Sequence, residues 1–292
     1  MKKIGIGIGC ALLLCGMTAL TGCGSEPSAP PASEVVSSEA VSETTSSEAI
    51  SSAAGESTSA QTTLELGDQL KKPEIGEEIA VIETTQGTIK MRLFPQAAPK
   101  TVENFKQLAE SGFYDGLDFH RIIDGFMIQT GQGSADDSIY GGSFEDEFSD
   151  ALLNLRGAVS MANTGVANTN TTQFFINQTT AEQFAGNGGW DYMKQGYEVY
   201  QSNPDGFTQT YGAWVDLSKA GEKVEELYTK YGGSPTLDGA YSTTGRGHTV
   251  FGQVFEGMDV VDKIAKAKVD SNNAPTSEDY KIESVSFTTY EG

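Results

Sequence analysis

Three short stretches of the 292-residue sequence concentrate the polar and aromatic side chains that could act together, at 119–129, 159–176 and 248–254. The two histidines, His120 and His248, have no carboxylate or thiol at a metal-ligand spacing, which argues against zinc. All three cysteines lie within the first 23 residues, so the rest of the chain holds no disulfide framework and no Cys-based metal site. We therefore expect a function that uses no thiol, no metal ion and no cofactor.

The charge of the chain is strongly acidic. There are 40 acidic and 19 basic residues, a net charge of -21, and such a surface repels nucleic-acid phosphates. We expect no nucleic-acid partner. Calcium at the acidic clusters 136–137 and 145–147 is an alternative use of this charge, but neither has the pattern of a twelve-residue calcium loop, and we interpret both as solvated faces.

The elements that must position the three stretches are mostly β-strands. Two β-rich runs, 79–84 and 88–94, flank Gln86-Gly87 and predict a hairpin. Further short apolar runs alternate with Gly- and Asn-rich turns, at 126–129, 158–162, 173–177, 249–254 and 282–287. That spacing is typical of an all-β barrel. Apolar residues on one helical face predict helices over 98–109 and 258–267.

The amino terminus has the features of an export signal. Lys2 and Lys3 precede an apolar run that is too short and too rich in glycine to favour a permanent membrane span. The run ends in Leu-Thr-Gly-Cys at Cys23, which resembles the lipobox of bacterial lipoproteins and implies a diacylated Cys23. We therefore predict a signal peptide over 1–22 and a lipid anchor at the extracytoplasmic face of a cell membrane. An uncleaved anchor is the alternative.

The next segment lacks the apolar residues of a core. From residue 24 to about residue 70 it is rich in Ser, Ala, Thr, Glu and Pro, so burial cannot offset its ordering entropy. We predict a lipidated cysteine and a disordered linker over 23–72, followed by one folded domain over 73–292. The folded part is acidic too, because residues 71–292 contain 17 basic and 32 acidic residues, a net charge of -15.

In order along the chain, the three stretches resemble the cyclophilin family of peptidyl-prolyl cis-trans isomerases. The resemblance covers about residues 76–290 and includes the intervening Ser143-Phe144-Glu145-Asp146-Glu147-Phe148. It implies a mainly β fold, an eight-stranded antiparallel β-barrel capped by two α-helices, in agreement with the apolar runs. It also implies binding of Xaa-Pro segments without a cofactor. We expect the protein to be monomeric.

The resemblance assigns roles to individual residues. It implies that Arg121 is the catalytic arginine, that Phe126 is a wall of the proline pocket, and that Gln129 holds the peptide or orients the arginine. The remaining positions are implied to bind the substrate or line its pocket: His120, Met127, Ala162, Asn163, Gln173, Phe175, Leu237 and His248.

Physical chemistry supports this set of side chains. The barrier to rotation about an Xaa-Pro bond is amide resonance, so the reaction needs no nucleophile, metal ion or redox group. The enzyme need only bind the twisted amide better than either planar form. Phe126, Met127 and Phe175 can grip the proline ring and exclude water, while Arg121 donates towards the prolyl nitrogen or holds the adjacent carbonyl.

The sequence also departs from the family pattern. The loop at 163–172 is one residue longer than usual, and Thr236 stands where many cyclophilins carry a tryptophan that contributes to cyclosporin binding, so we expect weak cyclosporin inhibition. The larger departure is an insertion at about 179–235, which holds both tryptophans. Its aromatic content predicts an ordered, partly helical segment with a helix over 215–231. This insertion either extends the client-binding surface or only covers the barrel edge.

The leading hypothesis is a lipid-anchored isomerase that accelerates the folding of exported proteins, which meet slow proline isomerisation after translocation. One alternative is a non-catalytic lipoprotein that binds Pro-containing segments or acts as a holdase. Another is a solute-binding or adhesion lipoprotein with a ligand site in the insertion. Substitution of Arg121 would leave the function of that protein unchanged.

Overall fold

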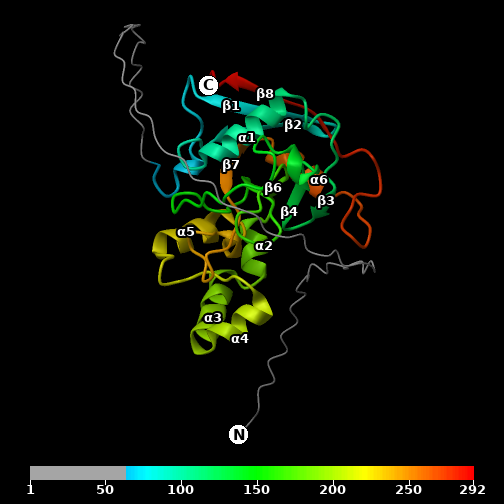
Figure 1. Cartoon of the computed structure of the whole chain (residues 1–292). Helices are drawn as coiled ribbons and strands as arrows, with labels where there is room; N and C mark the ends of the chain where they lie inside the picture. Colours follow the sequence, from blue (N-terminus) through cyan, green and yellow to red (C-terminus); the bar gives the residue numbers. More distant parts are fainter. Residues whose placement is uncertain (1–63) are drawn as a thin grey trace, which may run out of the picture. The chain divides into compact units, whose positions relative to one another are not determined.

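The computed structural model describes residues 64–292 (Figure 1). The predicted signal peptide, Cys23 and the linker up to residue 63 lie outside the described residues. Eight antiparallel strands form one sheet in the order β3-β4-β6-β5-β7-β2-β1-β8. Their bounds are β1 Glu78–Thr84, β2 Gly87–Leu93, β3 Arg121–Ile123, β4 Met127–Thr130, β5 Ala158–Met161, β6 Phe174–Asn177, β7 Val250–Glu256 and β8 Ile282–Thr289.

The two edges of the sheet approach each other. The segment before β3 and the segment before β8 meet at a bridge between Asp118 and Lys281, and the Phe119 N–H donates to the Tyr280 carbonyl at 2.9 Å. The sheet is therefore curled, as strand twist favours. This confirms the mainly β, eight-stranded antiparallel fold that the sequence predicts.

Two helices cap the sheet, α1 (Pro99–Glu110) and α6 (Met258–Ala265), within two residues of their predicted bounds. Pro99 suits the first turn of α1 because its missing N–H has no partner there in any case. Phe105 projects from α1 into the core, where it packs against the rings of Tyr114, Phe174, Phe251 and Phe287. No helix within residues 64–292 is long and apolar enough to cross a membrane.

The insertion is ordered and largely helical, as predicted. It contains α2 (Ala181–Gly186), α3 (Gly189–Ser202), α4 (Pro204–Tyr211) and α5 (Glu222–Tyr231). These helices enclose a second hydrophobic core, which includes Phe184, Trp190, Met193, Phe207, Trp214, Leu227 and Tyr228. In Figure 1 the four helices are drawn in green to yellow, and α3 and α4 lie beside each other, away from the sheet.

The predicted start of the last insertion helix is wrong. The sequence predicts a helix over 215–231, but α5 begins only at Glu222, after Gly221. Val215 instead pairs with Ser242 as an isolated β-bridge. The Asp216 side chain accepts a hydrogen bond from the Ser218 N–H at 3.0 Å, which is an Asx-type turn that competes with helix.

The ends of the insertion meet. Gly232 has a φ of 75°, and a Cβ atom added there would lie 2.4 Å from the Thr180 carbonyl carbon, so only glycine allows this approach. Gly233 then pairs with Leu155, and a short 3-10 helix, η3 (Pro235–Leu237), follows. The chain therefore leaves and rejoins the sheet at one place.

Residues 64–72 pack against the barrel, so the predicted linker boundary at residue 72 is too late. They include the 3-10 helix η1 (Asp68–Leu70). Gln69 is buried, and its Nε2 donates to the Leu153 carbonyl at 2.9 Å and to Gln253 Oε1 at 3.0 Å. Composition alone could not show this anchoring, because it depends on one polar side chain that finds its partners about 85 and 185 residues further along the chain.

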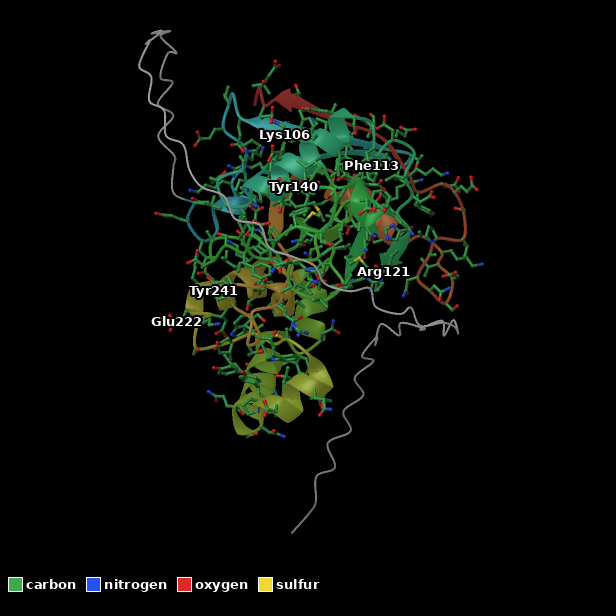
Figure 2. The ribbon with its side chains drawn as sticks, in the orientation of Figure 1. Lys106, Phe113, Arg121, Tyr140, Glu222 and Tyr241 are labelled. Carbon is green, nitrogen blue, oxygen red and sulfur yellow. The ribbon has the colours of Figure 1, made fainter. Side chains whose placement is uncertain are left out.

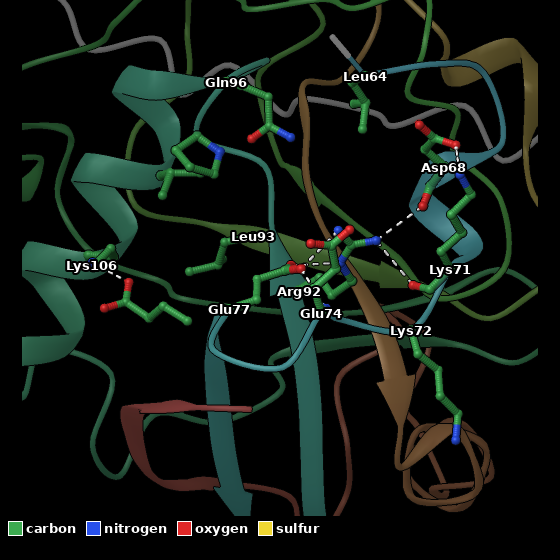
Figure 3. A pocket seen from close by; sticks show the side chains of 13 residues that line it. Leu64, Asp68, Lys71, Lys72, Glu74, Glu77, Arg92, Leu93, Gln96 and Lys106 are labelled. Atoms are coloured by element: carbon green, nitrogen blue, oxygen red, sulfur yellow. Dashed lines mark hydrogen bonds and ion pairs between the residues drawn. The ribbon is translucent and has the colours of Figure 1, made fainter. Parts of the chain in front are cut away.

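Charged pairs complete this attachment (Figure 3). Arg92 Nη1 donates to the carbonyls of Asp68 and Lys71, each at 3.1 Å, while its Nε bonds to Glu77 Oε1 at 2.7 Å. Lys71 forms an ion pair with the Asp68 carboxylate at 2.6 Å. These side chains border a cavity of about 410 Å³. Because six of its eight charged side chains are paired with one another, we assign it to the attachment of the segment rather than to ligand binding.

Candidate active site

The candidate site occupies the face of β3, β4 and β6 that points away from the barrel core. Strand pairing places Arg121 opposite Gln129, and Gln129 opposite Phe175. Since side chains alternate between the two faces of a strand, the adjacent row enters the core. That row consists of Ile122, Ile128 and Ile176. Figure 2 shows Arg121 beside β3 and β4.

A small cavity lies on this face, with a volume of about 100 Å³. It brings together nine of the eleven residues predicted for the site: Arg121, Phe126, Met127, Gln129, Ala162, Asn163, Phe175, Leu237 and His248. We call it the proline cavity. Five of its nine lining side chains are apolar, and one guanidinium group, two carboxamides and one imidazole complete the walls. This mixture suits a ligand that is an apolar ring joined to an amide.

The guanidinium group of Arg121 bonds to Gln129, which bonds in turn to Gln173. Arg121 Nη1 donates to Gln129 Oε1 at 3.2 Å and lies 3.9 Å from Met127 Sδ. Gln129 Nε2 in turn donates to Gln173 Oε1 at 2.9 Å. Gln173 does not line the cavity itself and is linked to Arg121 through Gln129.

His248 is uncharged at neutral pH. Burial lowers its pKa below the usual value of about 6.5. Its Nδ1 lies 2.9 Å from the Met161 carbonyl, which can only accept, so Nδ1 carries the proton and Nε2 is left as an acceptor. The ring meets Phe175 edge to face, with ring centroids 5.2 Å apart. The positive charge in the cavity wall is therefore that of Arg121.

Leu237 is held in the cavity wall by a backbone hydrogen bond from His248 and by the buried residue that follows it, Asp238. The His248 N–H donates to the Leu237 carbonyl at 2.9 Å. The next residue, Asp238, is buried, and its carboxylate accepts hydrogen bonds from the Asn154 N–H at 2.7 Å and from the Tyr228 hydroxyl at 2.5 Å. Burial raises the pKa of Asp238 to about 7. Tyr228 belongs to α5, so the insertion contacts the wall of the proline cavity through this buried group.

His120 lies outside the proline cavity. It lines a different cavity of about 270 Å³, together with Asp118 and residues 274–278. Burial lowers the pKa of His120 too. His120 precedes β3, and the structure places it in this other cavity instead of with the other predicted substrate-binding residues.

A larger cavity adjoins the proline cavity, with a volume of about 330 Å³, and shares Asn163, Leu237 and His248 with it. We call it the flanking cavity. Sequence reasoning did not assign Ala213 or Arg246, which both line it. Arg246 stands two residues before the predicted site residue His248, and this short separation could have indicated that Arg246 lies near the site. Ala213 is in the insertion, and nothing in its sequence context pointed to the site.

The acidic cluster 145–147 is engaged with protein groups rather than grouped around an empty centre. Glu147 Oε2 accepts from the Thr101 N–H and hydroxyl, each at 2.8 Å. Glu145 pairs with Lys100. In the part of the chain that the structure describes, no group of three or more acidic, histidine or cysteine side chains could hold a metal ion.

Comparison with known proteins agrees with the geometry. The sequence model of the family "Cyclophilin type peptidyl-prolyl cis-trans isomerase/CLD" matches residues 79–210 and 217–287. A Staphylococcus aureus (strain COL) protein named "Putative peptidyl-prolyl cis-trans isomerase" is 41% identical over 219 residues, which cover 74% of this chain and 94% of that protein. A Staphylococcus haemolyticus protein with the same name is 42% identical over 222 residues, covering 74% and 95%.

Among solved structures, a cyclophilin-type isomerase of Cryptosporidium parvum aligns with a TM-score of 0.49 and 24% identity, over 73% of this chain and 98% of that one. The same parasite protein was also crystallised in the presence of the dipeptide Ala-Pro. The family sequence model spans more than half of the chain, and the Staphylococcus aureus relative is 41% identical over 94% of its own length. The chain belongs to the cyclophilin-type peptidyl-prolyl cis-trans isomerase family.

Proposed function

We propose that the proline cavity isomerises Xaa-Pro bonds of exported polypeptides and that Arg121 is its hydrogen-bond donor. The observation that carries this proposal is the guanidinium group of Arg121, bonded to Gln129 at 3.2 Å in the wall of a small cavity that also contains Phe126, Met127 and Phe175. The proline ring enters between Phe126, Met127 and Phe175. As the amide twists and its nitrogen pyramidalises, Arg121 donates to that nitrogen or holds the adjacent carbonyl.

The lowering of the isomerisation barrier is divided between Arg121 and the apolar side chains of the cavity. An acceleration of roughly 10⁵-fold lowers the barrier by about 7 kcal/mol, while a hydrogen bond to a charged group contributes about 1.5 to 3 kcal/mol. Arg121 therefore supplies less than half of the effect. The rest comes from the apolar walls, which exclude the water that stabilises the planar amide.

The uncharged state of His248 fits this division. A protonated imidazole beside Arg121 would bring water and a second positive charge into the cavity. The cavity lowers the isomerisation barrier by excluding water, so this charge would weaken its effect. Burial and the Nδ1 contact with the Met161 carbonyl keep the ring in one tautomer. Asn163 Nδ2 donates to the Gly247 carbonyl at 2.8 Å, which braces the same edge of the cavity.

The location of the enzyme is part of the proposal. The signal-like residues 1–22 and the lipobox-like sequence before Cys23 support a lipid-anchored protein outside the cytoplasm, where exported chains fold. Mass spectrometry of the mature amino-terminal peptide tests this location. A diacylglyceryl group on Cys23 supports the anchor, and an unmodified or uncleaved terminus contradicts it.

Turnover of a short Xaa-Pro peptide tests the catalytic role. We expect Arg121→Ala to lower kcat/KM by about 10- to 150-fold, because one charge-assisted hydrogen bond is lost. Arg121→Lys keeps the charge but not the planar fork, so it should recover only part of the rate. The melting temperature serves as the folding control. Equal, fast rates for the wild type and Arg121→Ala would contradict the role of Arg121, and negligible rates for both would favour the holdase alternative.

A further inference from the structure

The flanking cavity is built by the barrel and the insertion together. The barrel provides Val166 and Ala167 from the loop after β5, and Arg246 from the segment before β7. The insertion provides Gly212 and Ala213, which follow α4. These two residues fall between the two parts of the chain that the family model matches, 79–210 and 217–287. One wall of the cavity is therefore outside the matched sequence.

That wall is fixed. The Trp214 N–H donates to the Thr243 hydroxyl at 3.1 Å, and the Thr243 N–H donates back to the Trp214 carbonyl at 2.9 Å. The buried Trp214 indole donates to the Met193 carbonyl at 3.0 Å. Ala213 precedes a residue anchored at three atoms, so the cavity has a preformed side instead of a loop that must order on binding.

The charges around the flanking cavity favour an uncharged ligand. Asp146 is already engaged, because its Oδ2 accepts from the Asn168 N–H and its Oδ1 from the Asn170 side chain, both at 2.9 Å. Arg246 is exposed and, within residues 64–292, has no ion-pair partner. One positive and one negative group offset each other. Most of the other lining is glycine backbone or small apolar side chains: Gly165, Val166, Ala167, Ala213 and Leu237.

The volume of the flanking cavity and its connection to the proline cavity indicate what kind of group it holds. A volume of about 330 Å³ is that of a small ligand pocket. The cavity shares Asn163, Leu237 and His248 with the proline cavity, so a peptide whose proline occupies one can place a nearby side chain in the other. The planar guanidinium group of Arg246 offers a stacking surface for a ring.

We propose that the flanking cavity binds an aromatic side chain of the client, within three residues of the isomerised proline, and that the insertion thereby sets the sequence preference of the enzyme. This inference rests on the proposed isomerase function. It assigns Ala213, Thr236 and Arg246 to substrate selection.

The test compares peptides that differ at one position. Each contains a single Ala-Pro bond in an alanine and glycine background, with Phe placed in turn at the second and third positions before the proline and at the three positions after it. The ratio of kcat/KM for the Phe and Ala peptides measures the preference. We expect a ratio of about ten at one position, the value for partial burial of one large apolar side chain.

Variants then locate the preference. Ala213→Trp fills the cavity from the insertion side and should bring the ratio towards one, as should Thr236→Trp from the barrel side. Val199→Trp is the matched control, because it adds the same side chain at an exposed position of α3, and it should keep the wild-type ratio. Arg246→Ala changes an exposed side chain, so its folding is secure, and it should lower the ratio part of the way.

Peptide affinity, measured by fluorescence anisotropy with a labelled peptide, separates this inference from the isomerase proposal. If turnover is absent but the Phe peptide binds several-fold more tightly and Ala213→Trp removes that gain, the isomerase proposal fails and the flanking cavity stands. If turnover depends on Arg121 but no position prefers Phe, the inference is overturned. A preference that survives in both Ala213→Trp and Thr236→Trp overturns it as well.

Discussion

The barrel core and the insertion core are built from different kinds of side chain. Aliphatic residues and phenylalanines dominate the barrel core, whereas the insertion core contains Trp190, Trp214, Tyr228 and Tyr241. The rings around Phe105 in the barrel core pack against one another. In the insertion core, Trp214, Tyr228 and Tyr241 supply both bulk and hydrogen bonds.

The comparison also shows where the two cores join. The Tyr228 hydroxyl comes from the insertion and Asn154 from the segment before β5, and both bind the buried carboxylate of Asp238. Asn154 Oδ1 in turn accepts from the Ser160 hydroxyl at 2.8 Å. A polar network therefore links the insertion to the strand behind the proline cavity. If the two cores act as one cooperative unit, damage to either should affect both.

The largest expected effect comes from the barrel core. Phe105→Ala removes a buried ring that contacts four others, and it should lower the free energy of unfolding by about 3 to 5 kcal/mol. Urea unfolding followed by tryptophan fluorescence reports the insertion, because both tryptophans lie there. We expect this transition to move together with the one seen by circular dichroism. A tryptophan transition that stays in place would show that the cores unfold separately.

The second effect is a pH dependence at the junction. The pKa of Asp238 is raised to about 7 in the folded protein, from about 3.8, so the folded state binds the proton more tightly. Its contribution to stability is complete below about pH 4 and is lost as the pH rises through 7, an effect on the order of 4 kcal/mol at most.

Asp238→Asn removes this titrating group while keeping its shape. Urea midpoints measured from pH 4 to pH 8 should fall less steeply with pH in the variant than in the wild type. Parallel slopes for the two proteins would place the charge-sensitive group elsewhere and would weaken the view that Asp238 is the junction of the cores.

The smallest effect is the removal of one hydroxyl. Tyr228→Phe takes a donor from the buried Asp238 carboxylate and should cost about 1 to 3 kcal/mol of unfolding free energy. Tyr211→Phe is the control, because the Tyr211 side chain is partly exposed and its ring packs against Phe207. Equal, negligible changes in both variants would show that packing alone joins the two regions.

The barrel could be predicted from sequence because its signals are local. Alternating apolar residues and a Gln86-Gly87 turn predicted the hairpin that the structure shows as β1 and β2. The residues of the proline cavity could be predicted because most of them lie in three short stretches whose order along the chain resembles that of cyclophilins. Strand pairing then sets Arg121, Gln129 and Phe175 side by side, which no single stretch reveals.

The insertion could be predicted only in outline, because tertiary contacts decide its details. Helix α3 contains Gly196, whose close contact with the Trp214 ring leaves no room for a Cβ atom, so a residue that weakens a helix locally is required by packing. The early turn at Asp216 and the β-bridge at Val215 likewise depend on partners in 241–243. The same holds for Gln69, whose partners lie in the barrel.

The meeting of Gly232 with Thr180 has a consequence for how the chain folds. About 70 residues separate β6 from β7, although both pair with β5. The entropy lost on closing a loop grows only with the logarithm of its length. Once the insertion has folded and its ends have met, the remaining loop is about 20 residues, which lowers the closure cost on the order of 1 kcal/mol. A segment that closes on itself in this way can lengthen or shorten in evolution while the strands on either side keep their register.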